Sequence, residues 1–158
     1  MLDAWAFIRY NSSRMNPASE RDESVRILVI DDEQVIRDLL SDVLSRKGYC
    51  VDTAEDGYRG LEKARGTAYR VVFTDIRMPG MNGLEVYKQL KTISPDSRVI
   101  VMTGFGLQEM INEALAMGAF ADIKKPFDLD DIYELVERAI KSTREQDGRH
   151  TTPPESRT

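Results

Sequence analysis

Short runs of branched apolar residues alternate along this chain with stretches in which apolar residues recur every three or four positions. Runs of four or five apolar residues fit buried strands, and the longer periodic stretches fit helices with one apolar face. The runs predict five strands, over Arg26–Ile30, Tyr49–Thr53, Val71–Thr74, Val99–Met102 and Ala121–Lys124. The periodic stretches predict helices over Val35–Leu44, Gly57–Gly66, Gly83–Ile93, Leu107–Met117 and Leu129–Ile140.

The strict alternation of strand and helix indicates the fold class. Consecutive strands joined by helices pair in parallel, and strands without polar alternation are buried on both faces. The pattern therefore predicts a doubly wound α/β domain with a five-stranded parallel sheet and five helices. Ligand sites in such sheets form outside the carboxyl ends of the strands, so the residues at those ends are the candidates for chemistry.

The alternating pattern occupies residues 25–141 and leaves a segment at each end. Residues 1–24 show no sustained period and predict a flexible N-terminal extension. Residues 142–158 are polar, contain Pro153 and Pro154, and predict a disordered tail or the beginning of a linker. We expect one domain, acting either alone or as part of a longer protein.

Composition narrows the range of partners. The chain has 22 Lys and Arg against 27 Asp and Glu, a formal net charge of −5, which argues against direct binding of nucleic acid. The apolar runs are far shorter than the roughly 20 residues that span a bilayer. An acid near the N-terminus, Asp3, is unlike the positively charged start of a signal peptide. We expect a cytoplasmic protein that does not enter membranes.

Acidic residues collect where two of the predicted strands end. Asp31 and Asp32 follow the first strand, and Asp75 follows the third. Two carboxylates about 4 Å apart repel by roughly 4 kcal/mol at an effective dielectric constant of about 20, so the group needs a cation. Oxygen ligands of this kind suit Mg²⁺. The alternative is that Asp31 and Asp32 cap the helix that follows, but Asp75 precedes a loop and capping does not explain it.

Two further strand ends carry groups that bind phosphate. Thr103 follows the fourth strand and offers a hydroxyl donor, and Lys125 follows the fifth and offers an ammonium. Either residue alone has an ordinary interpretation, as a turn threonine or a surface lysine. Together the residues are a specific signal for a site that binds a cation and a phosphate group. They are an acid pair, a lone aspartate, a threonine and a lysine, at the ends of strands one, three, four and five.

These residues resemble the receiver domain of two-component response regulators. The matching segments are Ile27–Glu33, Val71–Gly83, Val101–Gly104 and Ile123–Phe127, and the resemblance covers residues 25–141. It implies a flavodoxin-like (βα)5 fold with Asp75 as the acceptor of a phosphoryl group from a histidine kinase or phosphotransfer protein. It also implies Mg²⁺ held by Asp31, Asp32, Asp75 and the backbone carbonyl of Arg77. Thr103 is similar to the family's switch hydroxyl, Lys125 to its phosphate-binding lysine, and the Lys125–Pro126 bond to its cis peptide.

The chain departs from the family pattern at one position of the switch. Most receivers carry an aromatic residue three positions before the lysine, and here that residue is Asp122. We therefore expect a reorganising loop around Phe105 to take over the coupling to the threonine. Arg77 and Phe105 stand at the family's variable positions that control water access to the acyl phosphate, so exchange of either should alter phosphoryl lifetime.

Other functions fit the residues less well. A phosphatase of the haloacid-dehalogenase type also uses an aspartyl nucleophile, but it needs an acid two positions later, where this chain has Arg77. A flavodoxin-like binding module needs a phosphate-cradling glycine loop after the first strand, where this chain has Asp31 and Asp32. A degenerate receiver acting as a scaffold stays open, as does homodimerisation through the last two helices. The leading hypothesis is a phosphoacceptor switch and not an enzyme acting on a diffusible substrate.

Overall fold

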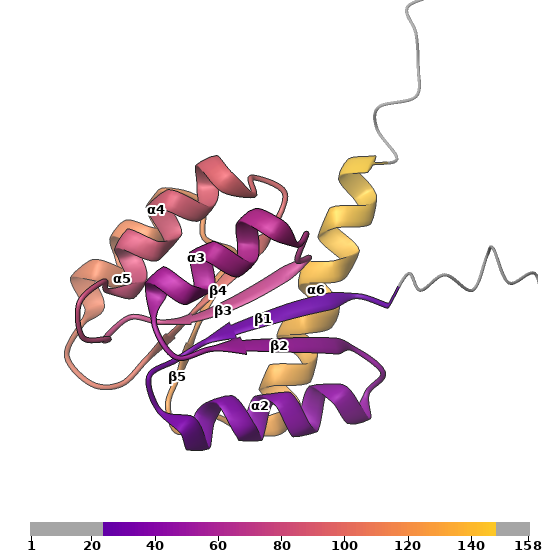
Figure 1. Ribbon diagram of the computed structural model, residues 1–158, viewed down its shortest axis with the longest axis horizontal. Coiled ribbons are helices and arrows are strands. Elements are labelled where there is room, and N and C mark those ends of the chain that lie inside the picture. The colour runs from indigo at the N-terminus through magenta and orange to yellow at the C-terminus, as the bar shows by residue number, and fades with distance from the viewer. Residues whose placement is uncertain (1–23, 148–158) are drawn as a thin grey trace, which may run out of the picture.

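The computed structural model describes residues 24–147, which form a parallel sheet flanked by helices (Figure 1). The strands are β1 (Arg26–Ile30), β2 (Cys50–Ala54), β3 (Val71–Asp75), β4 (Arg98–Thr103) and β5 (Ala121–Lys124). The helices are α2 (Gln34–Arg46), α3 (Gly57–Gly66), α4 (Gly83–Ile93), α5 (Gln108–Ala116) and α6 (Leu129–Asp147). The strand order is β2-β1-β3-β4-β5, and every pairing is parallel. The predicted fold class is confirmed.

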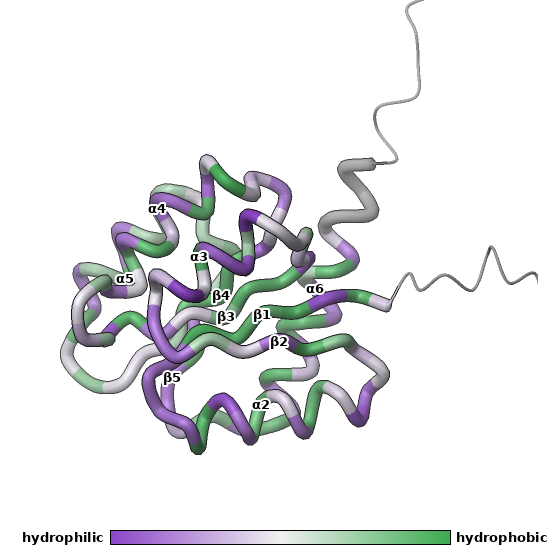
Figure 2. Tube along the Cα trace, in the orientation of Figure 1, coloured by the Kyte–Doolittle hydropathy of each residue, from purple (hydrophilic) through white to green (hydrophobic). Residues whose placement is uncertain are grey.

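The sheet separates two apolar cores. Helices α3, α4 and α5 cover one face, and α2 and α6 cover the other (Figure 1). Alternate residues of a strand enter opposite cores, as Leu28 and Val29 of β1 do. Because both faces are covered, β3 is buried along its whole length, and the central strands are mostly hydrophobic (Figure 2).

The order of the strands brings distant parts of the chain to one edge. Since all five strands are parallel, their carboxyl ends lie on the same side of the sheet, at the left in Figure 1. Asp31 directly follows β1, Asp75 ends β3, and Thr103 ends β4. Lys125 directly follows β5, so the residues singled out by the sequence all lie at this edge.

Six elements have boundaries that differ from those that the apolar pattern predicts, all but one of them by only one or two residues. Strand β2 is shifted by one residue and ends at Ala54, whose carbonyl accepts a hydrogen bond from the N–H of Asp31. Helix α6 continues past Ile140 to Asp147. Its last turns have no apolar period, but they contain neither glycine nor proline, so backbone propensity extends the helix where the pattern gives no signal.

The remaining predictions about the ends of the chain fall largely outside the described residues. Residues 1–23 of the predicted N-terminal extension and residues 148–158 of the predicted tail are not among them. Residues 142–147 are described, and they form the end of α6 rather than part of a disordered tail. Within residues 24–147, no helix has the length and apolar character needed to cross a membrane.

Candidate functional site

Three carboxylates from two strand ends meet at the carboxyl edge of the sheet. Ligand oxygens of Asp31, Asp32 and Asp75 all lie within 4.8 Å of one another. Asp31 and Asp75 are buried, with 0% and 4% of their surfaces exposed, while Asp32 is exposed to solvent. A fully buried carboxylate is costly without a cationic partner, so this cluster is not an ordinary solvated surface group.

The helix-capping alternative does not describe these acids. The N-cap of α2 is Glu33, and it makes no side-chain capping hydrogen bond. Asp31 instead accepts a hydrogen bond at Oδ1 from the N–H of Glu33, 2.9 Å away, which fixes the carboxylate within its own turn. By contrast, Asp56 caps α3, and Asn82 forms a capping box with Glu85 at the start of α4. The acids after β1 are therefore turned toward the site.

One ammonium group lies among the carboxylates. Lys125 Nζ is 2.6 Å from Oδ2 of Asp31, 3.3 Å from Oε1 of Glu33 and 3.5 Å from Oδ2 of Asp75. Its side chain is 13% exposed. The single positive charge of the lysine therefore offsets only part of the negative charge of these carboxylates. The remaining negative charge would favour binding of a further cation.

Burial and crowding move the titration of these groups. Burial, together with the charge of Asp31, raises the pKa of Asp75 to about 6 against the opposing attraction of Lys125. Burial also raises the pKa of Asp31, despite its hydrogen bond from Lys125. Burial alone would lower the pKa of Lys125, but the contact with Asp31 and the charge of Asp75 outweigh burial and raise it. The pattern is that of a cluster with too few cations.

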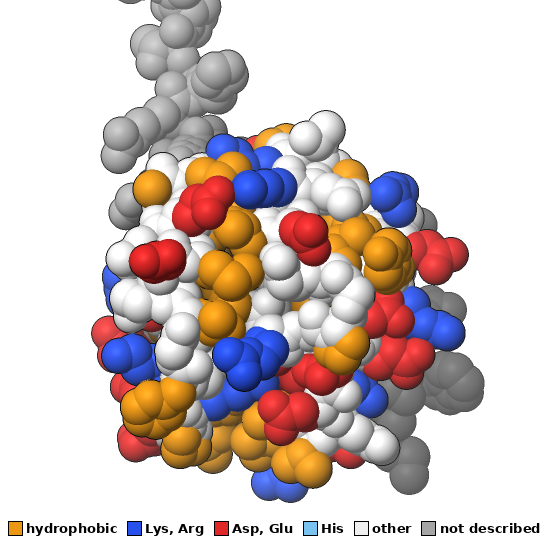
Figure 3. Space-filling view, turned by 90° about the vertical axis from the view of Figure 1, so that its left-hand side faces the viewer, with side chains coloured by type: hydrophobic (Ala, Val, Ile, Leu, Met, Phe, Trp, Pro, Cys, Tyr) orange, Lys and Arg blue, Asp and Glu red, His pale blue; other side chains and the backbone are white. Residues whose placement is uncertain are grey.

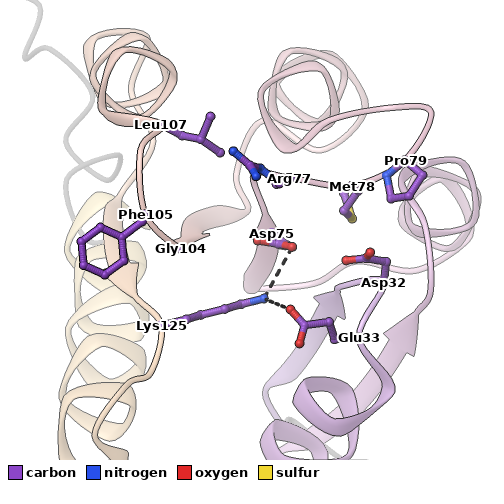
Figure 4. Close-up of a pocket in the computed structure, with 10 residues that line it drawn as sticks. All are labelled: Asp32, Glu33, Asp75, Arg77, Met78, Pro79, Gly104, Phe105, Leu107 and Lys125. Carbon is purple, nitrogen blue, oxygen red and sulfur yellow. Dashed lines mark hydrogen bonds and ion pairs between the residues drawn. The ribbon is translucent and has the colours of Figure 1, made fainter.

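A hollow of about 520 Å³ opens beside Asp75. Figure 4 shows Lys125 and Asp32 pointing toward Asp75 from opposite sides, whereas the ring of Phe105 points away. Figure 3 views this edge and shows acidic and basic side chains next to one another among hydrophobic ones. The hollow is lined by Asp32, Glu33, Asp75, Arg77, Met78, Pro79, Gly104, Phe105, Leu107 and Lys125. It gives a phosphoryl-sized group access to the buried aspartate.

The donor set fits Mg²⁺. All three clustered ligand groups are carboxylates, and neither thiol nor imidazole belongs to the cluster in the described part of the chain. A hard cation that keeps several waters and takes one or two carboxylates matches this set better than Zn²⁺, which favours nitrogen and sulfur ligands.

The chain matches the family model of the response regulator receiver domain over residues 27–137. The match covers most of the chain and includes every residue of the site. This chain belongs to the response regulator receiver family.

Relatives of this receiver domain include a protein of similar length and much longer proteins. It is 37% identical over 115 residues to sporulation initiation phosphotransferase F of Bacillus subtilis (strain 168), covering 73% of this chain and 93% of that protein. It is 40% identical over 120 residues to the DNA-binding transcriptional regulator NtrC of Escherichia coli (strain K12), covering 76% of this chain. The chain spans only about a quarter, 26%, of that regulator.

Solved structures agree with the fold. A receiver domain protein from Clostridium thermocellum superposes with a TM-score of 0.73 and 31% identity, over 77% of this chain and 98% of that one. NtrX from Brucella abortus, in a complex with ADP, superposes with a TM-score of 0.75 and 32% identity, over 84% of this chain and 31% of that one. The receiver fold predicted from the sequence is confirmed by these matches.

Thr103, at the end of β4, is hydrogen-bonded to its own loop. It is 1% exposed, and its hydroxyl donates a hydrogen bond to the carbonyl of Gly104 at 2.8 Å. It lines a second hollow, of about 250 Å³, which Lys125 also borders. The hydroxyl of the threonine is therefore engaged with its own loop.

The other positions named from the sequence are also placed. The Lys125–Pro126 peptide is cis, as the family resemblance implies. Arg77 is exposed and lines the larger hollow, while the role of its backbone carbonyl as a metal ligand stays a prediction. Asp122 is half-buried in β5, opposite Val101. The phosphatase and scaffold alternatives are not favoured, because Arg77 stands where the phosphatase needs an acid and every residue of the receiver phosphorylation motif is present.

Two contacts at the site carry little signal in the sequence. Glu33 joins Lys125 from the loop after β1. Gly83, at the start of α4, lies so close to β3 that an added Cβ would collide with the carbonyl oxygen of Asp75. A glycine at the beginning of a helix is common, so only the packing reveals that this position excludes every larger residue.

Proposed function

We propose that this receiver accepts a phosphoryl group on Asp75 from a histidine kinase or phosphotransfer protein. The observation that supports the proposal is the environment of this one carboxylate. It is buried at a strand end, its oxygen lies among those of Asp31 and Asp32, and Lys125 Nζ is 3.5 Å away. Such a site combines a nucleophile with the means to offset charge on an incoming phosphoryl group.

The transfer assigns a task to each side chain. An Oδ of Asp75 attacks phosphorus, a P–O bond forms, and the P–N bond to the donor histidine breaks with its electron pair passing to the imidazole nitrogen. Lys125 moves from Asp75 to a phosphoryl oxygen that takes up the charge. Asp31, Asp32, Asp75 and the backbone carbonyl of Arg77 would hold Mg²⁺, which when bound would offset charge on the phosphoryl oxygens.

Thr103 links the phosphoryl group to a loop through its single proton. A hydroxyl donates one hydrogen bond, and that of Thr103 now goes to the carbonyl of Gly104. If the hydroxyl turns to a phosphoryl oxygen, the bond to Gly104 is lost and the loop is released. The switch therefore needs no aromatic residue at position 122 to sense phosphorylation.

The released loop offers Phe105 as the moving part. Its ring is 99% exposed, and Gly104 and Gly106 flank it, the latter with a φ of +91°. The hollow of about 250 Å³ beside Thr103 lies beneath the same loop and has room for a phenyl ring. Burial of the ring there would favour the phosphorylated conformation through the hydrophobic effect. If Phe105→Ala leaves the phosphorylation-dependent amide shifts of α5 unchanged, this part of the proposal is wrong.

The phosphoacceptor is tested by mass spectrometry. Wild-type protein is incubated with Mg²⁺ and acetyl phosphate or beryllofluoride, beside Asp75→Asn and the matched control Asp52→Asn. We expect a Mg²⁺-dependent adduct in the wild type and in the control, and none in Asp75→Asn. An undiminished adduct in Asp75→Asn would reject Asp75 as the acceptor, and no adduct in any protein would favour a scaffold.

The proposal also covers where the receiver acts, what it controls and how it assembles. A cytoplasmic receiver that controls a downstream partner or effector domain fits relatives that are a phosphotransferase and a transcriptional regulator. Helices α5 and α6 flank β5 next to the Phe105 loop, so a homodimer through these two helices would couple assembly to phosphorylation. Sedimentation with and without beryllofluoride tests this, and an unchanged monomer mass would reject the dimer.

A further inference from the structure

Arg37 connects helix α2 to the loop that carries the acid pair. Its Nη1 donates hydrogen bonds to the backbone carbonyl of Asp31 at 2.8 Å and to that of Asp32 at 3.1 Å. The side chain is half-buried beneath this loop. One guanidinium nitrogen thus holds two consecutive peptide groups, and these belong to the two residues whose carboxylates face Asp75.

Helix stability alone does not explain an arginine at this place. The first turn of a helix favours acidic side chains and disfavours cations, because the free N–H groups and the helix dipole are positive there. The first turn of α2 contains no acid, and its N-cap residue, Glu33, sends its carboxylate to Lys125. A cation in this turn therefore works against the helix and must be explained by the contacts it makes.

Those contacts fix the direction of the acid pair. With their carbonyls bound to Arg37, Asp31 and Asp32 have little backbone freedom, and the N–H of Asp31 is bound to the carbonyl of Ala54 on β2. The carboxylates of Asp31, Asp32 and Asp75 are then held within 4.8 Å despite their repulsion. An unrestrained loop would let them separate, and a cation would have to draw them together again on binding.

We infer that Arg37 is a positioning residue, which holds the Asp31–Asp32 segment in the conformation that binds a divalent cation. The inference rests on the proposed function, because it assumes that these acids hold Mg²⁺. Arg37 does not contact the cation or the phosphoryl group in this role. It acts only through the two backbone carbonyls, so its removal should weaken metal binding without abolishing phosphoryl transfer.

The test is a Mg²⁺ titration of the full chain by calorimetry and by amide chemical shifts. The variants are Arg37→Ala, Arg37→Lys and the control Arg59→Ala, an exposed arginine on α3 that pairs with Glu55 and Asp56. We expect Arg37→Ala to raise the Kd for Mg²⁺ by about 10- to 100-fold, as loss of supporting contacts to metal ligands does. Arg37→Lys should recover part of the affinity, and Arg59→Ala should bind as the wild type does.

Phosphorylation kinetics separate positioning from a general loss of structure. With Arg37→Ala, acetyl phosphate labelling should be slow at low Mg²⁺ and should return to the wild-type rate at saturating Mg²⁺. A rate that stays low at saturation, or a Kd for Mg²⁺ equal to that of the wild type, would overturn the inference. If Arg37→Ala does not fold, the same comparison is made with Arg37→Lys and Arg37→Gln.

The wild-type titration keeps this inference distinct from the proposed function. Absence of Mg²⁺ binding and of labelling in the wild type would reject both. Normal Mg²⁺ binding and labelling in the wild type, with unchanged affinity in Arg37→Ala, would reject the role of Arg37 alone.

Discussion

Carboxylates are paired differently near the amino ends of the strands and at their carboxyl ends. Asp52, in the middle of the edge strand β2, accepts hydrogen bonds from two residues at the amino ends of β3 and β1: from the hydroxyl of Tyr69 at 2.6 Å and from Arg26 at 3.1 Å. At the carboxyl ends, Lys125 is shared between three carboxylates, including those of Asp31 and Asp75. The carboxylate near the amino ends is therefore fully paired, whereas the carboxyl ends carry more negative charge than Lys125 can offset.

The directions of the pKa shifts reflect this difference. The hydrogen bond from Tyr69, followed by that from Arg26, lowers the pKa of Asp52 below its ordinary value. Burial and the hydrogen bond to Asp52 raise the pKa of Tyr69 to about 12. Asp75, by contrast, has its pKa raised to about 6. The amino end stabilises the fold, whereas the carboxyl end stores unfavourable charge that a ligand can relieve.

The largest effect should come from removing the shared ammonium. Lys125→Met leaves Asp31 fully buried without its cation, and loss of one partner of a buried ion pair costs about 3–5 kcal/mol. We expect the free energy of unfolding in Mg²⁺-free buffer at pH 7.5 to fall by about that much. The loss should be smaller at pH 5, because protonation of Asp31 removes the unpaired charge. Urea denaturation at both pH values measures the loss of stability. An unchanged stability would mean that the carboxylates at the carboxyl ends of the strands need no cationic partner.

A smaller effect, of opposite sign, is expected for Asp75→Asn. Folding raises the pKa of this carboxyl from 3.8 to about 6, so its contribution to stability is present below pH 3.8 and is lost as the pH rises through 6. The asparagine variant, which cannot ionise, should be more stable than the wild type by about 3 kcal/mol above pH 7 in Mg²⁺-free buffer. The difference should shrink toward pH 4 and on addition of Mg²⁺ to the wild type. A stability difference between the two proteins that does not depend on pH would contradict the conclusion that ionised Asp75 destabilises the fold.

The smallest effect is expected at the paired end. Because folding lowers the pKa of Asp52, its contribution is present above its ordinary value of 3.8 and is lost as the pH falls through the lower folded value. Asp52→Asn should therefore destabilise the protein at pH 7 by about 1 kcal/mol, through weaker hydrogen bonds to Tyr69 and Arg26. The loss should disappear in strong acid. Equal signs for Asp52→Asn and Asp75→Asn at pH 7.5 would remove the distinction between the two ends.

Local sequence patterns determined a large part of this protein. Apolar runs and helical periods depend on residues that are neighbours in the chain, and they predicted five strands, five helices and a parallel sheet. Because parallel strands end on one side, the same pattern predicted that Asp31, Asp75, Thr103 and Lys125 lie at one edge. The end of α6 escaped prediction because its last turns depend on backbone propensity and carry no apolar period.

Only the tertiary structure decided how the groups at that edge meet. The strand order β2-β1-β3-β4-β5 brings Lys125 to Asp31 across 94 residues, a contact that no local pattern encodes. The same holds for Arg37, which looks like any helix arginine in the sequence but bonds two loop carbonyls in the fold. Side-chain and backbone conformations also direct the Thr103 hydroxyl to Gly104. Propensity and period are properties of chain neighbours, whereas the distances between charges and hydrogen-bonding groups are set by packing.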